Sequence, residues 1–162
     1  MSRGFADYVR NAGRMLSAPL SGFPGVALTD STVAENLRDA ELQTRTLIAL
    51  NKEVEFDVIF PMMDLTVETE ALGGVVDWET DEMPTVHDIT VASREDAEGL
   101  VVPEVGVGNR LGVFVKTCRD LKSAFPEKTV WAYVLGPFSI AGRLIGMTET
   151  AMRERHKRSR CE

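Results

Sequence analysis

The feature that most constrains the fold is a buried-strand pattern that leads directly to a lone carboxylate. Residues 58–60 form a continuous apolar run, which is typical of a strand covered on both faces in a parallel sheet. Pro61 ends this run, and Asp64 follows it closely. A short helix is then predicted over residues 67–72, closed by the glycine pair at 73–74. The stretch therefore predicts a strand, a turn that carries Asp64, and a helix.

Helical and strand patterns alternate along the rest of the chain. Thr32 and Glu35 have the spacing of a capping box, which starts a helix. Pro126 stops the most regular amphipathic pattern. The segment Gly136 to Gly142 turns from a strand into a helix, with Ser139 as the expected cap. We expect helices over residues 5–16, 39–53 and 111–125, strands near Ala18 and over residues 57–60, 75–78 and 129–135, and an irregular excursion over residues 84–103.

This alternation predicts an α/β fold with parallel strands. Three of the strands, near Ala18 and over residues 57–60 and 129–135, are of the barrel type. A closed TIM (β/α)8 barrel needs about eight strands and roughly 250 residues, whereas this chain has 162. We therefore expect a partial TIM barrel over residues 1–152. A basic, frayed tail is expected over residues 153–162.

Charge and cysteine content limit the partners and the compartment. The net charge of −7 argues against a nucleic-acid partner, because affinity for phosphates comes from clustered Lys and Arg. Two cysteines fit a reducing compartment. The N-terminus lacks the apolar core of a signal peptide, and no apolar run reaches the length that spans a membrane. We expect a cytoplasmic protein with no nucleic-acid or membrane partner.

Two stretches, Ile59 to Gly73 and Tyr133 to Met147, carry a family resemblance. In order and spacing they resemble the uroporphyrinogen decarboxylase superfamily, which includes the methylcobalamin:coenzyme M methyltransferases. The chain is more similar to the methyltransferase-like branch than to the decarboxylases in three shorter pieces, residues 24–30, 83–86 and 102–106.

The resemblance implies a fold, a reaction and a principal site residue. Members of the family are TIM barrels about twice as long as this chain, so the resemblance implies that this chain is the N-terminal half of such a barrel. Asp64 matches their active-site aspartate. The segment Arg10 to Arg14 resembles the arginine motif with which the decarboxylases bind substrate carboxylates. The implied reaction is corrinoid-dependent methyl transfer to a thiol. The alternatives are decarboxylation of a tetrapyrrole in porphyrin biosynthesis, and a non-catalytic remnant or binding subunit that needs a companion half.

Several residues are candidates for substrate binding beside the catalytic candidate Asp64. They are Met62, Met63, Gly136, Pro137, Phe138 and Arg143. Methionine adapts to irregular surfaces, so the methionine pair could contact a flat tetrapyrrole or fill the core. The glycine–proline turn could hold an anion or simply meet the backbone angles of a strand-to-helix turn. Asp64 itself could instead cap the helix that follows it at Thr66 or Val67.

The remaining metal-ligand and nucleophile candidates have plainer interpretations. The methyltransferases bind zinc through a His-x-Cys pair and a distant Cys in the second half of the barrel. This chain offers only His156 and Cys161 in its tail, so we expect no zinc site within it. Cys118 is predicted to pack inward, and His87 to lie on the surface. The expected partners are a tetrapyrrole, a corrinoid or a corrinoid protein, with either a second copy of the chain or a companion half-barrel.

Overall fold

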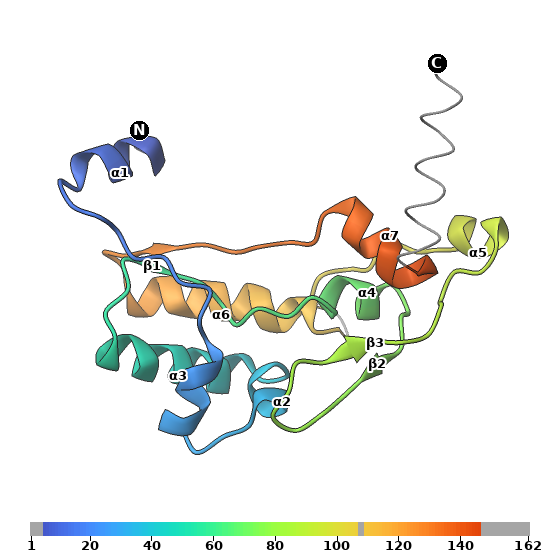
Figure 1. Cartoon of the computed structure of the whole chain (residues 1–162), viewed down its shortest axis with the longest axis horizontal. Coiled ribbons are helices and arrows are strands. Elements are labelled where there is room, and N and C mark those ends of the chain that lie inside the picture. Colours follow the sequence, from blue (N-terminus) through green and yellow to red (C-terminus); the bar gives the residue numbers. More distant parts are fainter. Residues whose placement is uncertain (1–4, 107–108, 147–162) are drawn as a thin grey trace.

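The computed structural model describes residues 5–106 and 109–146. Figure 1 shows a pair of strands lying over helix α6, with helix α3 beyond it, and shorter helices gathered around α7. In chain order the elements are α1 (Phe5–Asn11), the 3-10 helix η1 (Phe23–Leu28), α2 (Val33–Asn36), α3 (Ala40–Glu53), β1 (Val58–Ile59), α4 (Val67–Ala71), β2 (Val76–Asp77), β3 (Thr85–Val86), α5 (Arg94–Glu98), α6 (Leu111–Ala124), β4 (Thr129–Val130) and α7 (Pro137–Ile145).

The strand pair consists of β1 and β4, which run parallel. Val58 lies opposite Thr129 and Ile59 opposite Val130. The ladder continues where the N–H of Trp131 donates to the carbonyl of Ile59 at 2.9 Å. Strands β2 and β3 form a separate antiparallel pair. The predicted α/β class with parallel strands is therefore confirmed.

The strand expected near Ala18 is not formed, although its segment lies beside β1. The carbonyl of Ser17 accepts hydrogen bonds from the N–H groups of Asp57 and Val58, at 3.0 and 3.2 Å. Five residues later Gly22 packs on Met62 so closely that a Cβ at Gly22 would lie 2.5 Å from Met62 Cγ. Residues 17–22 thus follow residues 57–62 in the same direction. The prediction of a strand was wrong because Pro19 has no N–H to donate to a ladder.

The core lies between β1 and the helices that cover it. Its buried members come from α2, α3, α6 and the end of β1, and they are Val33, Leu37, Leu47, Ile59, Met62 and Leu121. The capping box is confirmed, because Thr32 Oγ1 accepts from Glu35 N and the Glu35 carboxylate accepts from Thr32 N. The predicted second helix is confirmed as α3, with Asp39 capping two N–H groups of its first turn. Amphipathic helices packed over a strand account for this core.

Two helix ends differ from the prediction. Helix α1 ends at Asn11 rather than near residue 16. The cap of α7 is Gly136, so the prediction of Ser139 was wrong. The helix begins earlier because Pro137 occupies its first position, where a missing N–H costs nothing.

Residues 153–162, the predicted tail, lie outside the described residues. Among the described helices, none has the length and apolar character needed to cross a membrane.

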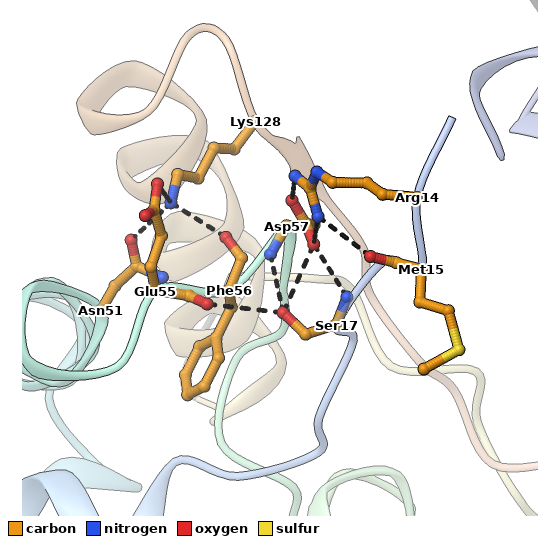
Figure 2. A network of polar contacts seen from close by, with 8 residues as sticks. All are labelled: Arg14, Met15, Ser17, Asn51, Glu55, Phe56, Asp57 and Lys128. Atoms are coloured by element: carbon orange, nitrogen blue, oxygen red, sulfur yellow. Dashed lines mark hydrogen bonds and ion pairs between the residues drawn. The ribbon is translucent and has the colours of Figure 1, made fainter. Parts of the chain in front are cut away.

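A lysine joins three elements at the start of the strand pair (Figure 2). Lys128 Nζ donates to Asn51 Oδ1 in α3 and to the carbonyl of Phe56 before β1, both at 2.9 Å. Glu55 Oε1 lies 3.7 Å from the same nitrogen. The side chain of Lys128 is 15% exposed, so its charge is largely removed from water and depends on these acceptors. Lys128 therefore fixes the register in which β4 meets β1.

An arginine forms an ion pair on the other side of the same strand end (Figure 2). Both oxygens of the Asp57 carboxylate accept from the Arg14 guanidinium, one of them at 2.9 Å. The N–H of Ser17 donates to Asp57 Oδ2 at 2.8 Å. These donors, the guanidinium first, hold the pKa of the Asp57 carboxyl well below its usual range. The ion pair and the Ser17 hydrogen bond hold residues 14–17 against the start of β1.

We predict that Lys128→Met lowers the free energy of unfolding by about 1–3 kcal/mol, because Asn51 Oδ1 and the Phe56 carbonyl lose their donor. Lys116→Met is the matched control. Lys116 pairs with Glu41 and Asp120 at the surface, and its loss should cost less than about 1 kcal/mol. Urea unfolding of both variants measures the difference, and equal losses would contradict the role given to Lys128.

We also predict a pH dependence that originates in Asp57. A carboxyl whose pKa is lowered by folding contributes stability above its unfolded pKa of about 3.9. That contribution is lost as the pH falls from about 4 toward the folded pKa. Asp57→Asn should therefore flatten the acid limb of a plot of the urea midpoint against pH. Asp81→Asn, in an exposed loop, should leave this limb unchanged, and a wild-type slope in Asp57→Asn would refute the prediction.

Candidate functional site

Asp64 lies in the turn that follows β1, with its side chain fully buried. Oδ1 accepts from the N–H and from the hydroxyl of Thr66, both at 2.7 Å. Thr66 is the N-cap of α4 and caps no N–H group with its own side chain. The carboxylate of Asp64 thus shapes the entry to α4 from two residues upstream. This contact is close to the alternative role considered from the sequence, in which Asp64 caps the following helix at Thr66 or Val67.

Arg110, the residue before α6, holds the other carboxylate oxygen. Its Nη1 donates to Asp64 Oδ2, its Nη2 donates to Thr66 Oγ1 at 2.8 Å, and its Nε donates to Glu70 in α4. The guanidinium also lies over the Trp78 ring, 4.6 Å from the ring centre. The Arg110 side chain is 9% exposed, and such a charge is tolerated in the interior because it is paired and hydrogen-bonded.

Tyr133 connects the extension of β4 to the same turn. Its hydroxyl donates to the carbonyl of Met62 and accepts from the N–H of Asp64. Burial raises the pKa of the Tyr133 phenol, so it stays protonated and can act as donor and acceptor at once. Two residues later, the N–H of Leu135 donates to Glu68 Oε1 at 2.9 Å. The polar groups at the end of β1 are therefore held from β4, α4 and α6.

An apolar pocket of about 220 Å³ opens beside this turn, between α4, α6 and the extension of β4. Burial raises the pKa of the Cys118 thiol, which lies on the pocket wall, so this cysteine is a poor nucleophile. Cavities of about 150 Å³ hold a benzene-sized group, whereas sites for drug-sized ligands measure roughly 300–1,000 Å³. A tetrapyrrole or corrinoid does not fit in this pocket. Its lining residues are Pro61, Asp64, Val67, Glu68, Leu111, Phe114, Val115, Cys118, Ala132, Tyr133 and Val134.

The other predicted substrate-binding residues do not line this pocket. Met62 is fully buried in the core, and Met63 beside it is half-buried. Residues 136–138 form the exposed start of α7, where Phe138 is 46% exposed. Arg143 is half-buried in the last turn of the same helix. The structure thus brings together Asp64 and the pocket, and leaves the α7 candidates on a neighbouring helix that contacts α4.

No three His, Cys, Asp or Glu side chains come together to hold a metal ion within residues 5–106 and 109–146. His156 and Cys161 lie outside those ranges. His87 is exposed, as predicted. Its Nε2 lies 3.0 Å from Thr85 Oγ1 and 3.5 Å from Asp77 Oδ2. The described residues therefore do not supply the three protein ligands of a zinc site.

Sequence reasoning missed the groups that hold Asp64. Arg110 stands directly before a clear helix pattern, and nothing in its local spacing marks it for burial. Tyr133 begins one of the two stretches that carry the family resemblance, so its position was a usable signal. Glu70 and Trp78 look like ordinary surface and strand residues in the sequence. Their partners lie tens of residues away along the chain, beyond the reach of a periodic pattern.

Comparison with known proteins gives a family and a fold. The model of the family described as Uroporphyrinogen decarboxylase (URO-D) matches residues 8–159. A methyltransferase from Methanosarcina mazei has a similar structure, with a TM-score of 0.69 at 18% sequence identity. The match covers 85% of this chain and 40% of that protein, so this chain corresponds to less than half of it. No match was found among curated proteins.

We predict that Arg110→Met destabilises the fold by about 3–5 kcal/mol, because it leaves the Asp64 carboxylate buried without a counter-charge. The double variant Asp64→Leu, Arg110→Met should lose less stability than the sum of the two single variants. The exposed pair Arg94–Glu98 provides the control, since Arg94→Met should cost less than about 0.5 kcal/mol. Additive losses in a urea-unfolding cycle would show that Asp64 and Arg110 are not coupled.

Proposed function

Because the chain belongs to the uroporphyrinogen decarboxylase family, we propose that it serves a reaction of the methyltransferase-like branch, the transfer of a methyl group from a corrinoid to a thiol. The observation that carries this proposal is Asp64, a buried carboxylate at the carboxyl end of a parallel strand beside an apolar pocket. This is the end of a strand where barrel enzymes place their chemistry. The fold likeness to a methyltransferase supports the choice of branch.

In this proposal the chain forms part of a TIM barrel, its N-terminal half, with Asp64 as the catalytic residue. The pocket beside Asp64 takes only a small apolar group, so a corrinoid would lie across the open face at the strand ends. Met63, residues 136–138 and Arg143 are the proposed contacts on that face. Zinc would activate the thiol in the methyltransferase branch. The described residues offer no ligand set for zinc, so we derive no step through it, and its ligands would have to come from other polypeptide.

Decarboxylation of a tetrapyrrole is the second candidate, and the position of Arg14 weakens it. Arg14 matches one arginine of the decarboxylases' motif, yet it is bound to Asp57 at the start of β1. Asp64 follows the other end of that strand. Arg14 is therefore held at the opposite end of β1 from Asp64 and is poorly placed to bind the carboxylates of a substrate held there.

The third candidate is a non-catalytic subunit that needs a companion half. It is favoured by the contacts of Asp64, because both carboxylate oxygens already have donors within the chain. A purely structural Asp64 would show the same contacts. A direct measurement of ligand binding to this chain separates the three candidates. It can be made without knowledge of the complete assembly.

We predict that the chain binds hydroxocobalamin more tightly than uroporphyrin III in equilibrium dialysis. Arg143→Met, which removes one of the proposed contacts on the open face, should weaken binding about tenfold, equivalent to about 1.4 kcal/mol. Asp81→Asn, which removes an exposed charge from a loop, should not change it. Circular dichroism melts would show that the variants are folded. Preference for uroporphyrin III would favour decarboxylation, and absence of binding to either compound would favour the non-catalytic subunit.

A further inference from the structure

Trp78, directly after β2, contacts two arginines of very different exposure. The guanidinium carbon of Arg38 lies 3.7 Å from the centre of the ring, and that of Arg110 lies 4.6 Å from it. Arg38 is exposed just past the end of α2, whereas the Arg110 side chain is only 9% exposed. Trp78 itself is half-buried and packs against the core. It therefore connects the protein surface with the buried network that holds Asp64.

The nitrogens of the Arg110 guanidinium are all engaged in hydrogen bonds. Nε, Nη1 and Nη2 donate to Glu70, Asp64 and Thr66 in turn. These bonds hold the guanidinium within its plane, and they weaken steeply only after a large tilt. The face of a guanidinium is weakly hydrated and favours contact with an aromatic ring. The Trp78 ring is therefore the group that opposes a tilt of Arg110.

Arg38 is available to the ring because the carboxylates nearest to it in sequence are engaged elsewhere. The Glu35 carboxylate accepts from the N–H of Thr32 in the capping box of α2. Asp39 accepts from two N–H groups in the first turn of α3. Within the described residues the Arg38 guanidinium forms no ion pair. Its contact with Trp78 is a cation–π interaction at the surface.

Main-chain contacts keep Trp78 beside Arg38. Strand β2, directly before Trp78, pairs with β3. Two residues after Trp78, the carbonyl of Thr80 accepts from the N–H of Ala34 in α2 at 3.0 Å. The main chain is thus fixed on both sides of the ring, and one of these contacts is made by the helix that leads to Arg38.

We propose that Trp78 is a positioning residue for Asp64 and that it acts through Arg110. The ring holds the guanidinium in the orientation in which it donates to Asp64, and Arg38 holds the ring from the surface. A charged group that takes part in a reaction needs neighbours whose own orientation is fixed. This role rests on the proposed function, which assigns the reaction to Asp64. The effect of the ring on Arg110 can be measured without any ligand.

Hydrogen exchange of the Arg110 Nε–H with water, measured by NMR in the full chain, tests this role. The N–H of a fixed guanidinium exchanges only when the group moves away from its partners. Trp78→Leu removes the aromatic face and should raise the exchange rate about tenfold. Trp78→Phe keeps an aromatic face and should give a rate within about twofold of the wild type. The Nε–H of Arg94, in its exposed pair with Glu98, should exchange equally fast in all three proteins.

Arg38→Met tests the outer contact in a variant that should fold normally, because Arg38 is exposed. Loss of the cation should loosen the Trp78 ring and raise the exchange rate of the Arg110 Nε–H about threefold. Arg45→Met is the matched control. It removes an exposed positive charge from α3 and should leave the rate unchanged.

Two results would overturn the role of the ring. One is an exchange rate in Trp78→Leu equal to that of the wild type, and the other is a rate in Trp78→Phe as high as in Trp78→Leu. If circular dichroism shows that Trp78→Leu is unfolded, the outer variants decide, and equal rates in Arg38→Met and Arg45→Met would overturn it. Failure to bind hydroxocobalamin would contradict the proposed function instead, and it would leave these exchange rates unaffected.

Discussion

The arrangement around Asp64 depends on the burial of one guanidinium. Arg110 contacts Asp64 in the turn after β1, Thr66 and Glu70 at and within α4, and the ring of Trp78 beyond β2. A buried charge is costly unless hydrogen-bonded partners compensate it. Burial of the guanidinium is therefore favourable only when all of these segments are in place around it. The network explains how short elements, with strands of only two residues, hold a defined turn at the end of β1.

The two stretches that carry the family resemblance meet in space. Asp64 and Glu68 belong to the first stretch, and they bond to Tyr133 and to the N–H of Leu135 in the second. A sequence similarity in separate pieces thus corresponds to one structural unit, the junction of β1, α4 and the extension of β4. The Asp64 carboxylate, the Arg110 guanidinium and the Tyr133 hydroxyl all have partners within the chain. A ligand would therefore have to approach beside these contacts or exchange for one of them.

Local chemistry explains which parts of this structure the sequence could predict. The capping box at Thr32, the helices α3 and α6, and the run that became β1 each depend on neighbours a few residues away, and all were confirmed. The strand near Ala18 failed because pairing depends on a second segment, and Pro19 removes a donor from it. The position of Asp64 was predicted from its place after a strand. Its partner Arg110 is 46 residues away, and no periodic pattern encodes such a pairing.

Gly22 has a consequence for recognising proteins built in the same way. Because its Cα rests against Met62, even the methyl group of alanine would overlap Met62 Cγ. With methionine at position 62, residues 17–22 can follow β1 in this way only while position 22 has no side chain. A related sequence with a larger residue at this position would need either a smaller one in place of Met62 or a different course for its first segment. The pair formed by positions 22 and 62 is therefore a compact signature to look for when distant sequences are aligned.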